Sequence, residues 1–227
     1  MSITNFVRNV RQNYKEDGAW SWLLCFCACL ANAIVMGIDY SFGEPFGSIM
    51  KDFNATEDSV AWIHSVQVSV HTFSAALSSM LAEKLGFSVL IAIGTLVFTV
   101  SMAISVISNS VSVLILFYGV FGGFSLGLIY TPCNIICSFH FIKWRSLATG
   151  VAICGSGIGI IIISEAMNFI IPSYGWKGCM ILCACITPLN TLMAGVAYIL
   201  PEHYDVLTAE EDEENINSVD ETVKGAK

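Results

Sequence analysis

The stretch SVLIAIGTLVFTVSMAISVIS, residues 88–108, decides the fold class. It holds no charged side chain, and it is as long as the roughly 20 apolar residues that a helix needs to cross a bilayer. Working outward, five further stretches are similarly long and apolar. Helices are preferred because lipid requires each backbone amide to bond within its own segment. The sequence therefore predicts an all-α membrane protein with six transmembrane helices, at about Trp20–Phe42, Val60–Leu81, Ser88–Ser108, Val111–Phe139, Leu147–Ile171 and Gly178–Leu200.

The overall composition agrees with a membrane protein. Hydrophobic residues make up 55% of the 227 residues, charged residues make up 12%, and the mean hydropathy is +0.70. An average soluble chain carries about 25% charged residues. The net charge of −8 is concentrated in the tail, where nine of the eighteen acidic residues lie between Glu202 and Glu221. The rest is close to neutral, so no nucleic-acid partner is predicted.

The nine cysteines are interpreted as small, buried, reduced side chains. Disulfides need an oxidising compartment, and zinc sites need paired spacings in polar loops. All of the cysteines instead lie within apolar stretches, at Cys25, Cys27, Cys29, Cys133, Cys137, Cys154, Cys179, Cys183 and Cys185. The sequence also holds no nucleophile–base pair, phosphate-binding loop or metal-ligand spacing. Neither an enzyme nor a cofactor or metal is predicted.

Lysine and arginine residues predict the orientation. With the N-terminus inside, eight of the ten fall in cytosolic segments, and only Lys51 and Lys177 fall outside, as the positive-inside rule requires. Three regions are predicted: a cytosolic N-terminal segment 1–19, a transmembrane domain 20–200, and an acidic, disordered cytosolic tail 201–227. The first apolar run is too long for a cleavable signal, so the first helix is expected to serve as an uncleaved signal anchor.

Small residues in two spans are spaced for close helix packing. They form stripes at Gly119, Gly123 and Gly127, and at Ala148, Ala152, Ser156 and Gly159. Such stripes let two backbones approach in lipid, and a sliding surface during transport would use the same residues. Pro132, in the fourth span, is expected to kink the helix and free a carbonyl.

Two motifs carry more information than hydropathy. The first is DGAWSW, residues 17–22, and the second is FHFIKWRSLATG, residues 139–150, followed by GSG at 155–157. They resemble the opening signature and the basic helix 4–5 loop of the monocarboxylate transporter family. Segments 62–65 and 174–178 match as well. The motif residues are Asp17, Gly18, Trp20, Trp22, Lys143, Arg145, Leu147, Ala148, Gly150, Gly155 and Ser156.

The resemblance implies a major facilitator fold in the plasma membrane, with two six-helix halves around a central cavity. This chain resembles the N-terminal half. A second half or a homodimer would complete the cavity, and a single-span accessory subunit is a further implied partner. The family carries small organic solutes, by default monocarboxylates, with proton coupling in some members. The resemblance to one half of the fold leaves four origins of the chain open: a fragment, a truncated splice product, an incomplete gene prediction, or a genuine half-size protein.

Titratable groups inside a span are costly and mark functional sites. The resemblance places His71 and Thr72 on the cavity, with Gln67 one turn earlier. Histidine changes charge near neutral pH, and the alternative for His71 is a hydrogen-bonded packing role. Glu165 is a candidate for substrate or proton binding. Asp39 and Glu44, near the outer end of the first span, are interpreted as interfacial.

Further candidates follow from the kink and from the resemblance. Thr131 and Asn134 flank Pro132, where they would line the cavity or satisfy the kinked backbone. Tyr40 aligns with a lysine of proton-coupled members, so aromatic amino acids, thyroid hormones and creatine remain alternatives to lactate. Lys143 and Arg145 are expected to fix topology and contact lipid headgroups. The resemblance adds a gating role, with Trp144 in place of the middle basic residue.

Two functional classes compete. The first is secondary transport of a small organic solute by alternating access. The second is a non-transporting, half-size membrane protein that associates with full-length carriers and modulates them.

Overall fold

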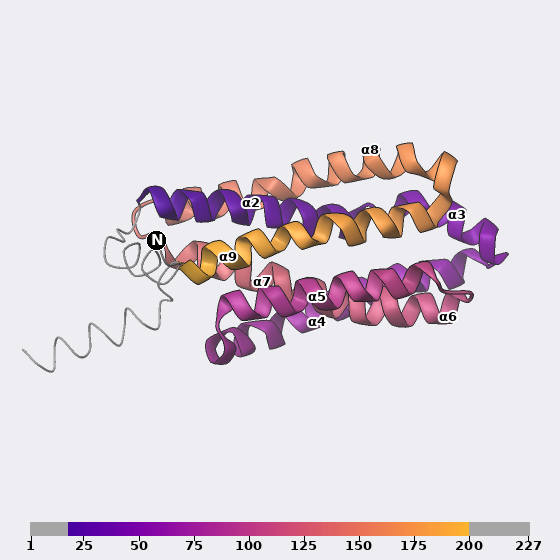
Figure 1. The fold of residues 1–227 in the computed structure, drawn as a ribbon, viewed down its shortest axis with the longest axis horizontal. Coiled ribbons are helices and arrows are strands. Elements are labelled where there is room, and N and C mark those ends of the chain that lie inside the picture. Colours follow the sequence, from indigo (N-terminus) through magenta and orange to yellow (C-terminus); the bar gives the residue numbers. More distant parts are fainter. Residues whose placement is uncertain (1–17, 200–227) are drawn as a thin grey trace, which may run out of the picture.

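The computed structural model describes residues 18–199, which form a bundle of long helices with no strand (Figure 1). Asp17, the rest of segment 1–17 and the predicted tail lie outside the described residues. The helices are α2 (Ala19–Tyr40), α3 (Gly43–Phe53), α4 (Glu57–Leu85), α5 (Phe87–Val106), α6 (Val111–Leu114), the π-helix η1 (Ile115–Gly122), α7 (Gly123–Phe139), α8 (Arg145–Ile186), the 3₁₀-helix η2 (Thr187–Leu189) and α9 (Asn190–Ile199).

Four helical stretches among these residues are long and apolar enough to cross a membrane: Ala19–Phe53, Phe87–Val106, Val111–Phe139 and Arg145–Ala197. The all-helical membrane fold is thus confirmed, whereas the count of six spans is not. α4 has 29 residues, but it carries serines, Gln67, His71 and Thr72 along its middle, which lower its hydropathy.

The last of the four stretches is bent. Its 53 residues would extend about 80 Å as one straight helix, far more than the roughly 30 Å of a bilayer core. Gly175 interrupts it with φ 62° and ψ −160°, a conformation essentially reserved for glycine. The chain turns back there, so that the second arm of α8 and α9 run antiparallel to the first arm (Figure 1).

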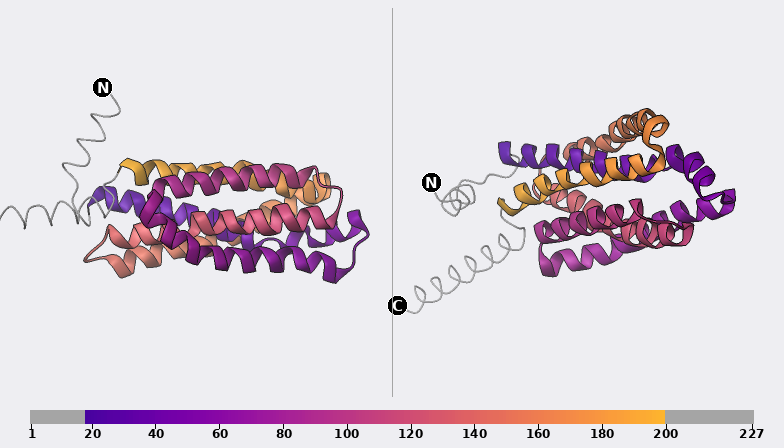
Figure 2. Two further views of the ribbon diagram at one scale, coloured as in Figure 1. Left: turned by 90° about the horizontal axis from the view of Figure 1, so that it is seen from below. Right: turned by 45° about the vertical axis from the view of Figure 1, so that its right-hand side comes forward.

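The two most extensive helix contacts are that of α2 with α8 and that of α4 with α7. α5 packs against both α7 and α9. Figure 2 shows the resulting elongated bundle from two further sides, with the start of α2 and the end of α9 at the same end. A Cβ at Gly123 would lie 2.4 Å from the Gln67 carbonyl oxygen, and one at Gly159 would lie 2.0 Å from that of Ala33. The close approach predicted for both small-residue stripes is therefore confirmed.

The nine cysteines are free thiols, but their burial differs from the prediction. Five are buried, at Cys25, Cys133, Cys137, Cys179 and Cys183. Cys154 and Cys185 are exposed, so for these two the interpretation as buried was wrong. Apolarity of the surrounding stretch does not distinguish the buried side of a helix from its exposed side.

Candidate functional site

A buried carboxylate–imidazole pair lies in the middle of the bundle. His71 Nδ1 is 3.0 Å from Asp39 Oδ2, and only 7% of His71 and 3% of Asp39 are exposed. His71 is the central residue of α4, and Asp39 belongs to the last turn of α2. The sequence places Asp39 near the outer end of the first span, and the structure adds that its carboxylate is buried inside the bundle, where it meets the imidazole of α4.

Three more polar side chains extend this pair. Gln67 is fully buried, and its Oε1 lies 3.4 Å from His64 Nδ1. Tyr118 of η1 is buried and interacts electrostatically with both Asp39 and Gln67. Two atoms of the group, Asp39 Oδ1 and Gln67 Nε2, are buried without a hydrogen-bond partner. We call Asp39, His64, Gln67, His71 and Tyr118 the polar cluster.

Helix geometry explains why α4 supplies three members of the polar cluster. His64, Gln67 and His71 are spaced i, i+3 and i+7, so they share one face of the helix. That face meets η1 and α7, where glycines allow close contact. A Cβ at Gly127 would lie 2.9 Å from the His71 carbonyl oxygen. The π-helix, a rare element often found at functional sites, holds Tyr118 in the buried interior.

Aromatic rings close the polar cluster on two sides. Tyr130 of α7 meets His71 edge to face, with ring centroids 5.8 Å apart and planes at 88°. Phe42 stacks on His64 at 5.3 Å, and it also lies 5.1 Å from Tyr118. These rings exclude water around the pair, and a low local dielectric strengthens its electrostatic interaction.

A second polar contact crosses three helices. Asn32 and Asn134 exchange two amide hydrogen bonds of 3.0 and 3.1 Å. Asn32 also donates to the Ala152 carbonyl, and Asn134 donates to the Tyr130 carbonyl, both at 2.9 Å. Asn134 thus bonds the backbone carbonyl four residues before it. The carbonyl left without its helical partner by Pro132 is that of Leu128, so a role of Asn134 in satisfying the kinked backbone stays a prediction. Asn32 was missed, although a lone amide in an apolar span is the available signal.

The structure separates the other cavity candidates from the polar cluster. Tyr40 is 64% exposed at the end of α2. Thr72 and Glu165 are exposed, and the Thr72 hydroxyl donates to the Val68 carbonyl. Thr131 is half-buried. Of the seven candidates, only Gln67 and His71 lie in the cluster, because adjacent helix positions point about 100° apart.

The two motif regions come together at one end of the bundle. Trp22 packs edge to face against Phe141, with ring centroids 5.2 Å apart. Cys25 Sγ donates to the Ala148 carbonyl at 3.3 Å, which anchors the start of α8 on α2. Lys143 Nζ lies 5.8 Å from the Trp144 ring. Gly18 precedes α2, Trp20 and Ser156 are half-buried, Ala148 and Gly155 are buried, and Lys143, Arg145, Leu147 and Gly150 are exposed.

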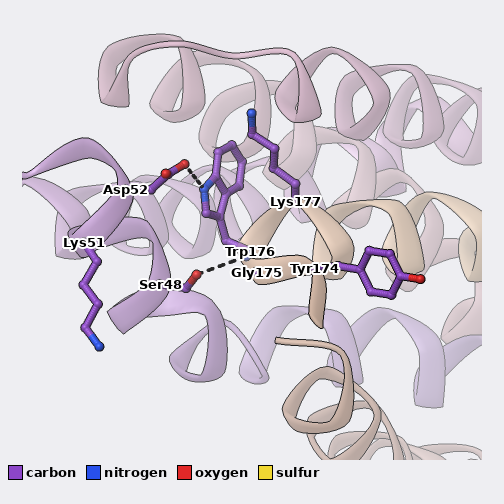
Figure 3. Close-up of a pocket in the computed structure, with 7 residues that line it drawn as sticks. All are labelled: Ser48, Lys51, Asp52, Tyr174, Gly175, Trp176 and Lys177. Atoms are coloured by element: carbon purple, nitrogen blue, oxygen red, sulfur yellow. Dashed lines mark hydrogen bonds between the residues drawn. The ribbon is translucent and has the colours of Figure 1, made fainter. Parts of the chain in front are cut away.

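The opposite end is fixed by contacts to the Gly175 bend. Trp176 Nε1 donates to Asp52 Oδ2 at 2.8 Å, and the Trp176 amide donates to Ser48 Oγ at 3.2 Å (Figure 3). These residues line a cavity of about 450 Å³ together with Lys51, Tyr174, Gly175 and Lys177. Nearby, Ser164 donates to Glu44 Oε1 at 2.6 Å. α3 is thereby held against both arms of α8.

Metal ligation is not supported by the described part of the chain. Across residues 18–199, no group of three or more His, Cys, Asp or Glu side chains is placed to hold a metal ion. The polar cluster supplies one carboxylate, two imidazoles, an amide and a phenol. This set is suited to proton binding and hydrogen bonding.

Comparison with known proteins identifies relatives along most of the chain. The Major Facilitator Superfamily model matches residues 21–224. Monocarboxylate transporter 2 of Mus musculus is 31% identical over 188 residues, which cover 81% of this chain and 38% of that protein. Monocarboxylate transporter 12 of Homo sapiens is 27% identical over 219 residues, covering 91% and 42%. Monocarboxylate transporter 13 of Rattus norvegicus is 28% identical over 178 residues, covering 78% and 42%.

These matches confirm the resemblance inferred from the two motifs. All three relatives are named as transporters, which agrees with the prediction of a protein that is not an enzyme. The chain spans about two fifths of the length of the curated relatives it matches.

Proposed function

Because the chain belongs to the Major Facilitator Superfamily, we propose that it serves secondary transport of a small organic solute by alternating access. The names of its relatives make a monocarboxylate the first substrate class to test. The observation that carries the proposal is the buried Asp39–His71 pair at mid-bundle. Buried ionisable groups inside membrane bundles are retained where a substrate, an ion or a proton must bind.

The proposal includes six membrane crossings with both termini in the cytosol. The bend at Gly175 divides the long apolar stretch into two arms, each of spanning length. α4 is also long enough to span, and it packs against α7 and η1, which belong to the stretch Val111–Phe139. An even number of crossings agrees with the start of α2 and the end of α9 lying at one end of the bundle (Figure 1). The excess of Lys and Arg assigns that end to the cytosol, and we place the protein in the plasma membrane.

Proton coupling follows from the chemistry of the pair. A protonated His71 neutralises the Asp39 carboxylate inside the bundle. Loss of that proton leaves a buried carboxylate without a counter-charge, which is strongly unfavourable. Proton occupancy therefore favours one arrangement of α2 and α4 over another, which is the coupling that symport needs.

Uptake measurements test this role. We would reconstitute the transporting assembly in liposomes and follow a radiolabelled short-chain monocarboxylate with and without an inward proton gradient. His71→Gln should remove the stimulation by the gradient, since glutamine keeps a hydrogen-bonding group but does not titrate. Ser69→Ala, at an exposed position of the same helix, is the matched control. An unchanged pH profile in His71→Gln would remove His71 from the mechanism.

The second candidate function is modulation of full-length carriers without transport. It applies if the natural protein is no longer than this chain, which spans about two fifths of each relative. An antibody to residues 1–19 would size the endogenous product. A band near twice the calculated 24.6 kDa indicates a longer carrier with a second six-helix half. A band near 24.6 kDa makes self-association, a separate second half or a single-span accessory subunit the partners to test.

The same chain in liposomes separates the two functions directly. Uptake by the purified 227-residue protein alone supports transport by a homodimer. Absence of uptake, with altered uptake when a full-length carrier is added, supports modulation.

A further inference from the structure

We propose that a groove at the start of α8 binds an acidic phospholipid such as phosphatidylserine, with its headgroup beside Lys143 and an acyl chain over Gly150. We call it the α8 groove. The proposal goes beyond transport, because it assigns a lipid site to the outside of the bundle. It rests on the proposed topology, which assigns the start of α8 to the cytosolic leaflet.

A missing side chain keeps the α8 groove open. The groove has a volume of about 520 Å³, and Gly150 is one of the residues that line it. Nothing lies within 4 Å of the position that a Cβ would take at Gly150. A larger side chain there would therefore occupy the groove without meeting a neighbouring helix. The other lining residues are Lys143, Trp144, Ser146, Leu147, Val151 and Cys154.

The lining changes from charged to apolar along the helix. Lys143 Nζ lies 5.8 Å from the centre of the Trp144 ring, and lysine and tryptophan are typical of the membrane–water interface. Cys154 lies ten residues after Trp144, which places it about 15 Å farther along the helix. Between them, Leu147 and Val151 are exposed apolar side chains. A phospholipid has the same order, with a charged headgroup followed by an apolar chain.

The two sides of α8 indicate that the α8 groove faces lipid. One side packs on α2, where a Cβ at Gly155 would lie 2.1 Å from the Cys29 carbonyl oxygen. The groove instead continues onto a side with large, exposed apolar residues at helical spacing, namely Val151, Ile158, Ile162 and Phe169. Contacts between membrane helices favour small residues, so a side of this composition is suited to acyl chains.

Charge complementarity selects an acidic lipid. Among the described residues, no Asp or Glu lines the α8 groove, and the first turn of α8 holds no acidic residue. Lys143 lines the groove, and Arg145 is exposed two residues later. The cytosolic leaflet contains anionic lipids that attract such juxtamembrane cations. Phosphatidylserine carries a net negative charge, whereas phosphatidylcholine carries none.

A photoactivatable phosphatidylserine, with the reactive group on an acyl chain, tests the site. The 227-residue chain would be placed in phosphatidylcholine nanodiscs that contain this probe. After illumination, the labelled peptides are mapped by mass spectrometry. We expect label between Leu147 and Cys154, and unlabelled phosphatidylserine should compete for it better than added phosphatidylcholine does.

Two variants and two matched controls sharpen the test. Lys143→Gln should lower the labelling about fivefold, the factor that corresponds to the contribution of one cation near an anionic membrane surface. Gly150→Leu should remove the label by filling the α8 groove. Gly157→Leu is its control, because the Cβ position there is equally open and lies outside the groove. Lys84→Gln, in the last turn of α4, controls for loss of positive charge, and both controls should keep the label.

The outcomes separate this site from other occupants. Equal labelling of Gly150→Leu and Gly157→Leu overturns the proposal, as does equal competition by the two lipids. Absence of label from the start of α8 also overturns it, and leaves the acidic tail 201–227 or a second copy of the chain as the occupant. If Lys143→Gln does not fold, Gly150→Leu still reports, because its new side chain enters open space. Failure of the proposed transport is distinguishable, since labelling involves neither a solute nor a proton gradient.

Discussion

At the scale of single residues, the bundle depends on a few polar pairs that are buried between helices. Asp39 and His71 form one such pair, with each side chain almost completely buried. Removing one partner leaves the other buried and unpaired, which costs more than the pair contributes when intact. The pair is therefore best tested by comparing single and double substitutions.

We predict that His71→Leu lowers the free energy of unfolding by about 3–5 kcal/mol, because it leaves the Asp39 carboxylate unpaired. The double variant Asp39→Leu/His71→Leu should recover at least half of this loss, since no buried charge remains. Thermal unfolding in detergent micelles measures both. Equal loss in the single and double variants would contradict a direct pair.

The asparagine pair gives a second, weaker residue-scale prediction. Asn32→Leu should lower stability by about 1–2 kcal/mol, the range found for hydrogen bonds between membrane helices. The effect is expected to disappear when Asn134→Leu is already present, apart from the bond from Asn32 to the Ala152 carbonyl. A double-mutant cycle on the same melting assay measures the coupling, and additive losses would exclude it.

At the scale of elements, the contact of α4 with η1 and α7 positions the polar cluster. Gly123 lies directly against the Gln67 backbone, and Gly127 lies against His71 and Ser74. Side chains at these positions would separate the helices, and the Asp39–His71 distance depends on α4 keeping its place. The same two glycines therefore determine both the separation of the helices and the distance between Asp39 and His71.

Gly123→Ala tests this coupling. A Cβ there would lie 2.4 Å from a backbone oxygen that cannot rotate away, so we expect a loss of about 1–3 kcal/mol, as for other overpacked cores. Gly150→Ala is the matched control, because nothing lies within 4 Å of its Cβ position and alanine favours helix by up to about 1 kcal/mol. Equal melting temperatures for the two variants would refute close packing at Gly123.

At the scale of the whole molecule, the arrangement leaves large apolar side chains exposed along the outside of several helices, among them Phe26, Trp62, Phe73, Leu96 and Phe169. Lipid, a second six-helix half or another copy of the chain would cover them. The proposed topology assigns the α3–α4 turn, with exposed Asn54, to the outer side.

Epitope tags test the topology. Tags at residues 1 and 227 should bind antibody only in permeabilised cells, and a tag inserted after Asn54 should bind it in intact cells. The reason is the excess of Lys and Arg on one side of the bundle. Surface staining of either terminus in intact cells would reverse the proposed orientation.

The sequence predicted the helical membrane fold, the close-packing glycines and two members of the polar cluster. His71 was found because titratable residues in a span are costly and because the family resemblance places it on the cavity. Gln67 was found because it lies one turn earlier on the same helix face. The pairing of Asp39 with His71 was not predicted because the two residues are 32 positions apart, and hydropathy does not encode contacts over such a separation. The π-helix and the contacts of Asn32 were not predicted for the same reason, since they depend on the neighbouring helix.

The π-helix at Ile115–Gly122 also fixes the number of residues that this segment can contain. A π turn accommodates one more residue than an α turn in the same span, so losing that residue would rotate everything downstream by about 100°. Gly119 would keep its contact with α4, while Gly123 and Gly127 would turn away from Gln67 and Ser74. Over evolutionary time, outward positions of this helix are free to vary in identity, but single-residue insertions and deletions between Gly119 and Gly127 should be eliminated by selection.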